Sequence, residues 1–203
     1  VMACRQWMLE RFEGSDGLGA IFPPIVWSIV ALRAMGCSDD SAEVSECWKQ
    51  LEGLLERPDE KTIRVEPCRS PVWDTAIALR GLAEITSPST SISTSMSSAV
   101  DWLLEREVRF AGDWSHRVKA VPSGWCFEYA NRYYPDVDDT AMVLIAFSSW
   151  MKQQNMSDEG IASRQLSSVK TATRRGIHWL TAMQNSDGGW GAFDRNNNHE
   201  ILC

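Results

Sequence analysis

Helical segments of two kinds alternate along this 203-residue chain. In one kind, apolar residues recur every three or four positions, which predicts a helix with one buried face. The other kind is apolar nearly all round and therefore has to be buried completely. The amphipathic segments are 2–12, 40–56, 97–108 and 163–184, and the apolar ones are 23–35, 71–85 and 137–151. This alternation favours an inner layer of helices wrapped by an outer layer, and an ordinary helical bundle is the alternative.

Composition narrows the function classes. Apolar residues make up 44% and charged residues 23%, which is ordinary for a globular protein, whereas ten tryptophans are unusually many. The net charge of −7 leaves no basic footprint for nucleic acid. The longest apolar run, 20–32, is interrupted and too short to span a bilayer. The six scattered cysteines show no metal-binding spacing and are expected to be reduced thiols.

A short pattern repeats along the chain. Its clearest copy spans 175–190 and places Gln184 between two tryptophans, ahead of a glycine-rich turn. An earlier copy at 101–114 has Glu107 where the glutamine would be, and a weaker copy spans 6–19. The glutamine can bind free backbone groups at a helix end, and the tryptophan can stack over it. Such a repeat is expected to tie adjacent helical units together, so most of its tryptophans have a structural role.

Three carboxylates lie close together at the start of the apolar segment 137–151: Asp136, Asp138 and Asp139. Packed together they cannot all ionise, so the pKa of at least one is raised and the group titrates as a unit. The N-terminus of the following helix stabilises the anion that remains after a proton is donated. Such a cluster provides a proton donor and a resident counter-charge in one motif. Taken alone, the residues also fit a solvated helix cap, whereas a calcium loop would require glycine at position 141.

Four blocks, in this order, resemble those of the squalene–hopene cyclases. They are Ser-Pro-Val-Trp-Asp-Thr at 70–75, Tyr-Tyr-Pro-Asp-Val-Asp-Asp-Thr-Ala at 133–141 (the DxDD motif), the repeat at 175–190 (the QW motif) and Gly-Gly-Trp-Gly-Ala-Phe-Asp at 188–194. The related oxidosqualene cyclases carry Asp-Cys-Thr-Ala where this chain has Asp-Asp-Thr-Ala. The resemblance therefore points to squalene as the substrate, instead of its epoxide.

The resemblance implies an all-α fold of two α/α-barrel domains, each built from alternating inner and outer helices. Family members are much longer than this chain, so we expect an internal fragment in which neither barrel is complete. Residues 1–68 would form the end of the first barrel domain. Residues 69–203 would form the start of the main part of the second, which bears the DxDD motif.

The resemblance also assigns roles to the carboxylates. Asp138 is expected to donate the proton that starts cyclisation, and Asp136 and Asp139 are expected to support it. The histidine that assists the donor in the family would lie beyond Cys203, since His199 is not in the matching context. No metal or cofactor is implied, because the aspartates supply the acid.

Further side chains are expected to surround the substrate. Aromatic faces stabilise a migrating cation without quenching it, although core packing is the alternative role for any one ring. The aromatic residues that match cavity-lining positions are Trp73, Phe127 and Phe193, the last replacing a tyrosine of some family members. The residues expected to support them from behind are Tyr133, Tyr134 and Asp74.

The implied activity of the whole enzyme is protonation of a terminal alkene of squalene and cyclisation to pentacyclic hopene or hopanol. Because squalene resides in bilayers, the complete protein is expected to dock peripherally on the cytoplasmic side of a membrane, and a homodimer is left open. The fragment alone is expected to be inactive, since half of the cavity wall is missing. Two alternatives stay open: a DxDD cyclase acting on another polyprenoid, and a non-catalytic α/α-toroid that binds ligands or partners.

Overall fold

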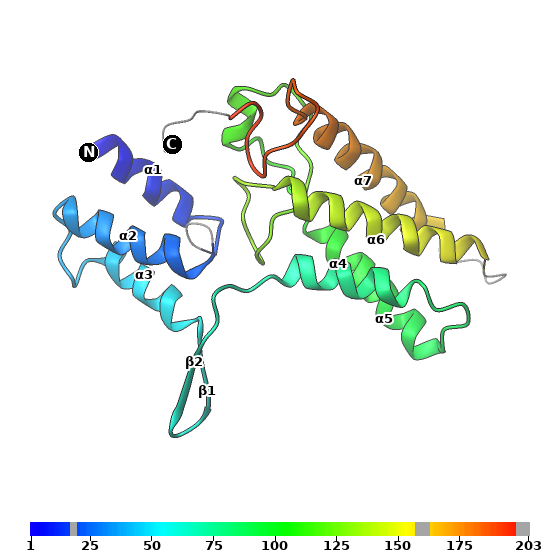
Figure 1. Ribbon diagram of the computed structural model, residues 1–203, viewed down its shortest axis with the longest axis horizontal. Coiled ribbons are helices and arrows are strands. Elements are labelled where there is room, and N and C mark those ends of the chain that lie inside the picture. Colours follow the sequence, from blue (N-terminus) through cyan, green and yellow to red (C-terminus); the bar gives the residue numbers. More distant parts are fainter. Residues whose placement is uncertain (17–19, 157–162, 198–203) are drawn as a thin grey trace. The chain divides into compact units, whose positions relative to one another are not determined.

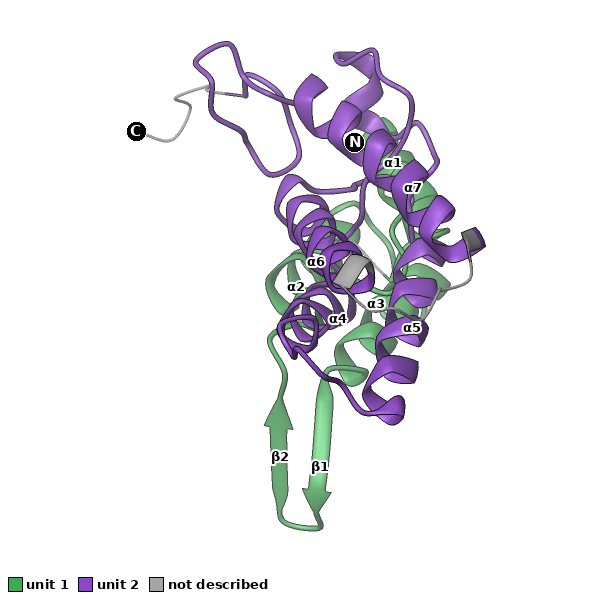
Figure 2. Cartoon of the chain, turned by 90° about the vertical axis from the view of Figure 1, so that its right-hand side faces the viewer, with its two compact units in different colours: residues 1–70, 128–131 green, residues 71–127, 132–203 purple. Residues whose placement is uncertain are grey.

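A computed structural model of the chain describes residues 1–16, 20–156 and 163–197 (Figure 1). The chain divides into two compact units (Figure 2). The first comprises residues 1–70 and 128–131, and the second comprises residues 71–127 and 132–203. The segment 128–131 therefore leaves the second unit in sequence and packs with the first.

In its described residues, the first unit holds three helices and a hairpin: α1 (Met2–Phe12), α2 (Phe22–Ala34), α3 (Ala42–Glu52), β1 (Leu55–Asp59) and β2 (Thr62–Val65). Two prolines in the first turn of α2 suit a helix start, where their missing N–H groups would have no partner. The Ser41 hydroxyl accepts from the Val44 N–H and caps α3. The core consists of Met8, Ile25, Leu32, Val44, Cys47 and Leu54.

The hairpin corrects the sequence reading, which continued the helical segment 40–56 to its end. Helix α3 stops at Glu52, and the chain then forms an antiparallel pair in which Leu55 faces Val65 and Glu56 faces Arg64. Pro58 in β1 cannot continue a helix, because it has no N–H to donate. Within the described residues this pair is the one sheet.

The second unit is built from α4 (Pro71–Leu82), α5 (Thr90–Glu105), the 3-10 helix η1 (Asp113–His116), α6 (Val137–Met156) and α7 (Ser163–Ala182). The apolar helices α4 and α6 pack against each other, while the amphipathic α5 and α7 pack on that pair and on each other (Figure 1). The predicted all-α class with inner and outer helices is thereby confirmed, in an incomplete form. The assignment of 1–68 and 69–203 to two barrel domains stays a prediction.

Complete burial of the apolar helices was an expectation that the structure corrects. Trp27 of α2, Ile77 of α4 and Ile145 of α6 are all exposed. Their opposite faces form the cores, as with Ile25 in α2 and Phe147 in α6. Each apolar helix therefore keeps one uncovered apolar face. Among the described residues, no helix has both the length and the apolar character needed to cross a membrane.

The repeats make specific contacts in the second unit. The indole N–H of Trp190 donates to the carbonyl of Leu180 in the last turn of α7 at 2.8 Å, whereas the Gln184 amide donates to the turn carbonyl of Gly188. The tryptophan, and not the glutamine, therefore satisfies the helix end. Trp114 of the earlier copy packs edge-to-face on Trp179 of the later copy, with ring centroids 5.9 Å apart. The repeat thus joins neighbouring helical units, as expected.

Candidate active site

The acidic motif lies at the N-terminus of α6, where Asp136 caps the helix. The Asp139 N–H donates to the Asp136 Oδ1 at 2.7 Å, and the Thr140 N–H donates to the Asp136 carbonyl at 3.2 Å. Asp136 and Asp139 are only 4% and 3% exposed, respectively, whereas Asp138 is exposed. The cap is real, but two of its three carboxylates are buried, so the interpretation as a solvated cap is wrong for them.

Burial is the main reason why the pKa of Asp136 is raised to about 8, and the nearby charges of Asp139 and Asp138 add to the effect. The hydrogen bond from the Asp139 N–H works in the opposite direction. Asp136 therefore carries a proton at neutral pH. The cluster combines a protonated buried acid with an exposed carboxyl group, Asp138, in the same helical turn.

Trp125 and Thr140 hold the motif in place, and the sequence reading did not single out either residue for this. The backbone N–H of Trp125 donates to the Thr140 Oγ1 at 2.9 Å, and its carbonyl accepts from the Asp136 N–H at 3.0 Å. The Trp125 indole donates to the Leu103 carbonyl at 2.7 Å. Gly124 has a φ of +112°, and an added Cβ would lie 2.9 Å from Pro135 and Thr140. The one available signal was a tryptophan close to Phe127.

Two of the predicted surrounding residues lie beside the motif. The Val137 N–H donates to the Ala192 carbonyl at 2.9 Å, which holds the loop that carries Phe193 against the start of α6. The rings of Tyr134 and Phe193 meet edge-to-face at 6.2 Å, and the Tyr134 hydroxyl donates to Asp113. Phe193 is 50% exposed.

The other predicted residues are placed as follows. Tyr133 is buried, packs edge-to-face on Phe110 at 5.5 Å and accepts a hydrogen bond from Arg132. Trp73 and Asp74 lie in the first turn of α4, the former partly buried and the latter exposed. Phe127 is partly buried and immediately precedes the segment 128–131. The roles of all nine predicted site residues stay predictions, and His199 and Cys203 lie outside the described residues.

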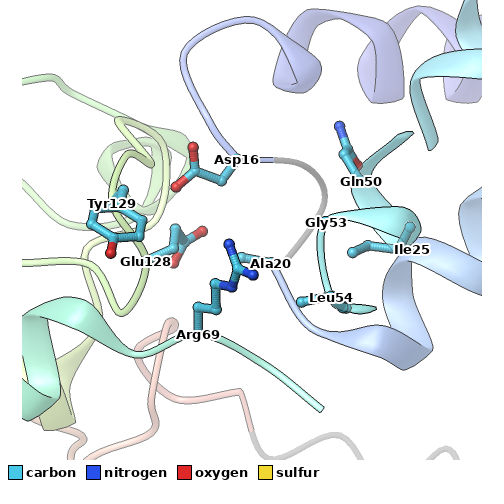
Figure 3. Close-up of a pocket in the computed structure, with 9 residues that line it drawn as sticks. All are labelled: Asp16, Ala20, Ile25, Gln50, Gly53, Leu54, Arg69, Glu128 and Tyr129. Carbon is cyan, nitrogen blue, oxygen red and sulfur yellow. The ribbon is translucent and has the colours of Figure 1, made fainter. Parts of the chain in front are cut away.

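A cavity of about 230 Å³ lies within the first unit (Figure 3). It is lined by Asp16, Ala20, Ile25, Gln50, Gly53, Leu54, Arg69, Glu128 and Tyr129. Asp16 accepts from the Ala130 N–H at 3.0 Å, and Arg69 pairs with Glu66 at 2.9 Å. A hydrocarbon in this cavity would take these charges out of water without replacing their hydration. The cavity therefore does not suit such a substrate.

Titration of Asp136 is expected to make the fold less stable as the pH rises toward 8. Its pKa is about 8 in the folded chain and near 3.8 in an unfolded one, so between these values the folded state binds the extra proton. The stabilisation is complete below pH 4 and is lost as the pH passes through 8, by at most about 1.4 kcal/mol per pH unit.

The Asp136→Asn variant keeps the Oδ1 acceptor for Asp139 but removes this titration. Its free energy of unfolding should therefore change less between pH 5 and pH 8 than that of the unmodified protein, as measured by thermal or urea unfolding. Asp187→Asn, in an exposed turn, is the control and should keep the original pH dependence. Identical pH profiles for Asp136→Asn and the unmodified protein would contradict the prediction.

Comparison with known proteins identifies the family of the chain. The model of the squalene-hopene cyclase C-terminal domain matches residues 69–203, and the model of the N-terminal domain matches residues 1–60. A squalene–hopene cyclase from Zymomonas mobilis is 34% identical over the whole chain, and one from Schizosaccharomyces japonicus is 37% identical over 98% of it. An enfumafungin synthase from Hormonema carpetanum is 36% identical over 98% of the chain.

The chain covers 30% of the Zymomonas protein, 29% of the Schizosaccharomyces protein and 14% of the Hormonema protein. Together with the helical fold, these matches place the chain in the class of the terpene cyclases. More narrowly, the chain belongs to the squalene–hopene cyclase family. In the described part of the chain, no group of three metal-binding side chains is placed to hold an ion.

Proposed function

We propose that the complete protein is a squalene–hopene cyclase, which protonates squalene and closes it to a pentacyclic triterpene. The observation that carries the proposal is the acidic cluster at the start of α6, where Asp136 is buried and protonated beside Asp138 and Asp139. Such a cluster is what the protonation of an alkene requires, because an alkene is a very weak base and the acid must hold its proton until the substrate arrives.

In the proposed mechanism, Asp138 delivers the proton that the acidic cluster holds to a terminal carbon–carbon double bond. The π electrons form the new C–H bond and leave a tertiary cation, which the next double bond attacks, and so on through the rings. Asp136 and Asp139 supply the remaining acid and base capacity of the cluster. The first N–H groups of α6 stabilise the carboxylate that forms, since a helix N-terminus favours negative charge.

Aromatic rings are proposed to protect the cation while it migrates. Trp73, Phe127 and Phe193 would present ring faces, which attract positive charge but carry no base that could remove a proton early. The series ends when a proton is lost, which gives hopene, or when water adds, which gives hopanol. No step requires a cofactor.

The complete protein is further proposed to dock peripherally on the cytoplasmic face of a membrane, and co-sedimentation with liposomes tests this.

The test is to incubate the complete protein with squalene and to identify the products by mass spectrometry. A pentacyclic triterpene isomeric with squalene, or its hydrate, is the expected product. Sequence identity to an enfumafungin synthase supports a second candidate function. In this second function, the protein is a related cyclase with another polyprenoid substrate or another product. Oxidosqualene and a C20 polyprenyl diphosphate are therefore assayed in parallel. Absence of any triterpene from squalene would reject the first proposal, and a product from a parallel substrate would support the second.

A further inference from the structure

Asp113, Tyr134 and Phe193 form a connected series of side chains in the second unit. The Tyr134 hydroxyl donates to a carboxylate oxygen of Asp113, 21 positions earlier in the sequence. The ring of Tyr134 meets that of Phe193 edge-to-face, with the ring planes at 83°. The series therefore joins the start of η1, the residue two positions before Asp136, and the loop after α7.

The Asp113 end of the series is firmly held. The Ser115 N–H and hydroxyl both bind the Gly112 carbonyl, at 3.0 and 2.7 Å, which fixes the first turn of η1. Gly112 also lies directly on the backbone of the acidic loop, because an added Cβ would be 2.0 Å from the Tyr133 carbonyl oxygen. The carboxylate that receives the Tyr134 hydroxyl is thus set on rigid backbone.

The Phe193 end is loosely held. Phe193 is 50% exposed in this chain, so few contacts from the described residues restrict its ring. The loop is fixed by the hydrogen bond from Val137 to Ala192, one residue away, but a backbone hydrogen bond does not set the angle of a neighbouring ring. The edge-to-face contact with Tyr134 is therefore the ring contact that orients Phe193.

We propose that Asp113 is a positioning residue which, by fixing the Tyr134 hydroxyl, holds the ring of Phe193 as a wall of the cavity beside the acidic motif. The inference rests on the proposed function, in which this wall shields the migrating cation. A charge-assisted hydrogen bond fixes the phenol more strongly than a neutral one would. When the hydrogen bond between Tyr134 and Asp113 is lost, the ring of Phe193 turns away for part of the time. The cation is then quenched more often, by water or by early deprotonation.

The first test uses Tyr134→Phe, Asp113→Asn and the double variant of the complete protein with squalene. The ratio of incompletely cyclised to pentacyclic product is expected to rise about 2- to 10-fold, the factor that corresponds to one edge-to-face ring contact. Total consumption of squalene should stay within a few-fold of the unmodified protein. Tyr134→Phe removes the link, whereas Asp113→Asn weakens it to a neutral hydrogen bond, so the double variant should give the same ratio as Tyr134→Phe alone. Tyr129→Phe and Asp39→Asn in the first unit are matched controls and should leave the ratio unchanged.

An unchanged product ratio in Tyr134→Phe, with squalene still cyclised, would overturn the proposed role of Asp113. If Asp113→Asn does not fold, Tyr134→Phe alone decides. A second measurement does not depend on the reaction: 4-fluorophenylalanine is placed at position 193 and its fluorine resonance is recorded. Tyr134→Phe should shift or broaden this resonance and Tyr129→Phe should not. An unaltered resonance would reject the positioning role of Asp113, whether or not squalene is a substrate. Failure of the squalene assay alone would reject only the proposed function.

Discussion

Replacing Asp138 with asparagine in the complete protein is expected to lower the rate of squalene cyclisation by about 10²- to 10⁴-fold, the range for loss of a general acid. The amide has nearly the same shape as the carboxylic acid but cannot give up a proton to an alkene. Because Asp138 is exposed in the second unit, the change should leave the fold intact. Product formation is followed by mass spectrometry, and folding is followed by circular dichroism and thermal unfolding.

Two variants accompany this measurement. Asp138→Glu retains the acid and should keep part of the activity. Asp40→Asn, an exposed carboxylate in the first unit, should keep all of it. Unchanged cyclisation by Asp138→Asn would contradict the assignment of the proton donor. The same experiment separates the enzyme from the non-catalytic toroid, because a binding module would have no cyclisation to lose.

Removing the guanidinium of Arg175 is expected to destabilise the protein by about 2 to 3 kcal/mol. Arg175 donates through Nε at 2.9 Å and through Nη2 to the carboxylate of Glu107, whose side chain is only 5% exposed. In Arg175→Ala, the buried Glu107 keeps the Ser123 hydroxyl at 2.7 Å and a distant Arg109 at 3.8 Å. The loss falls below that for a fully buried pair because Arg175 itself is 27% exposed. Thermal or urea unfolding of the complete protein measures it.

The neighbouring Arg174 offers a matched control, since it lies on the same helix but is exposed. Arg174→Ala should change the free energy of unfolding by only a few tenths of a kcal/mol. Adding Glu107→Gln to Arg175→Ala should recover part of the loss, because a neutral amide costs less to bury than an unpaired carboxylate. Equal losses for the two arginines, or no recovery in the double variant, would show that the pair does not link the repeats.

Helix positions in the second unit followed closely from local patterns. The segment predicted at 71–85 is α4 at Pro71–Leu82, and the one predicted at 163–184 is α7 at Ser163–Ala182. A proline in the first turn and apolar residues at helical spacing are local signals. Tertiary contacts with neighbouring elements do not change these helices. The hairpin at 55–65 was missed because its strands carry charged residues on exposed positions and lack a clear alternation.

The acidic motif was recognisable because its three carboxylates are neighbours in sequence, which forces them together in any fold. Their unequal burial was not recognisable. Asp136 and Asp139 are covered and Asp138 is not, because Trp125 and the loop after α7 reach the start of α6 from distant parts of the chain. The edge-to-face contact between the rings of Tyr134 and Phe193 likewise joins residues 59 positions apart, beyond the reach of any local pattern.

By itself, the sequence determined the helical class, the family and the identity of the acidic residues, because these depend on periodicity and on short blocks of neighbouring residues. Only the tertiary structure decided which carboxylate is buried and protonated, which tryptophan satisfies the end of α7, and how Glu107 and Arg175 join two repeats. Each of these depends on the distance between groups far apart in the chain. Burial, hydrogen bonding and pKa arise from such distances, and folding alone sets them.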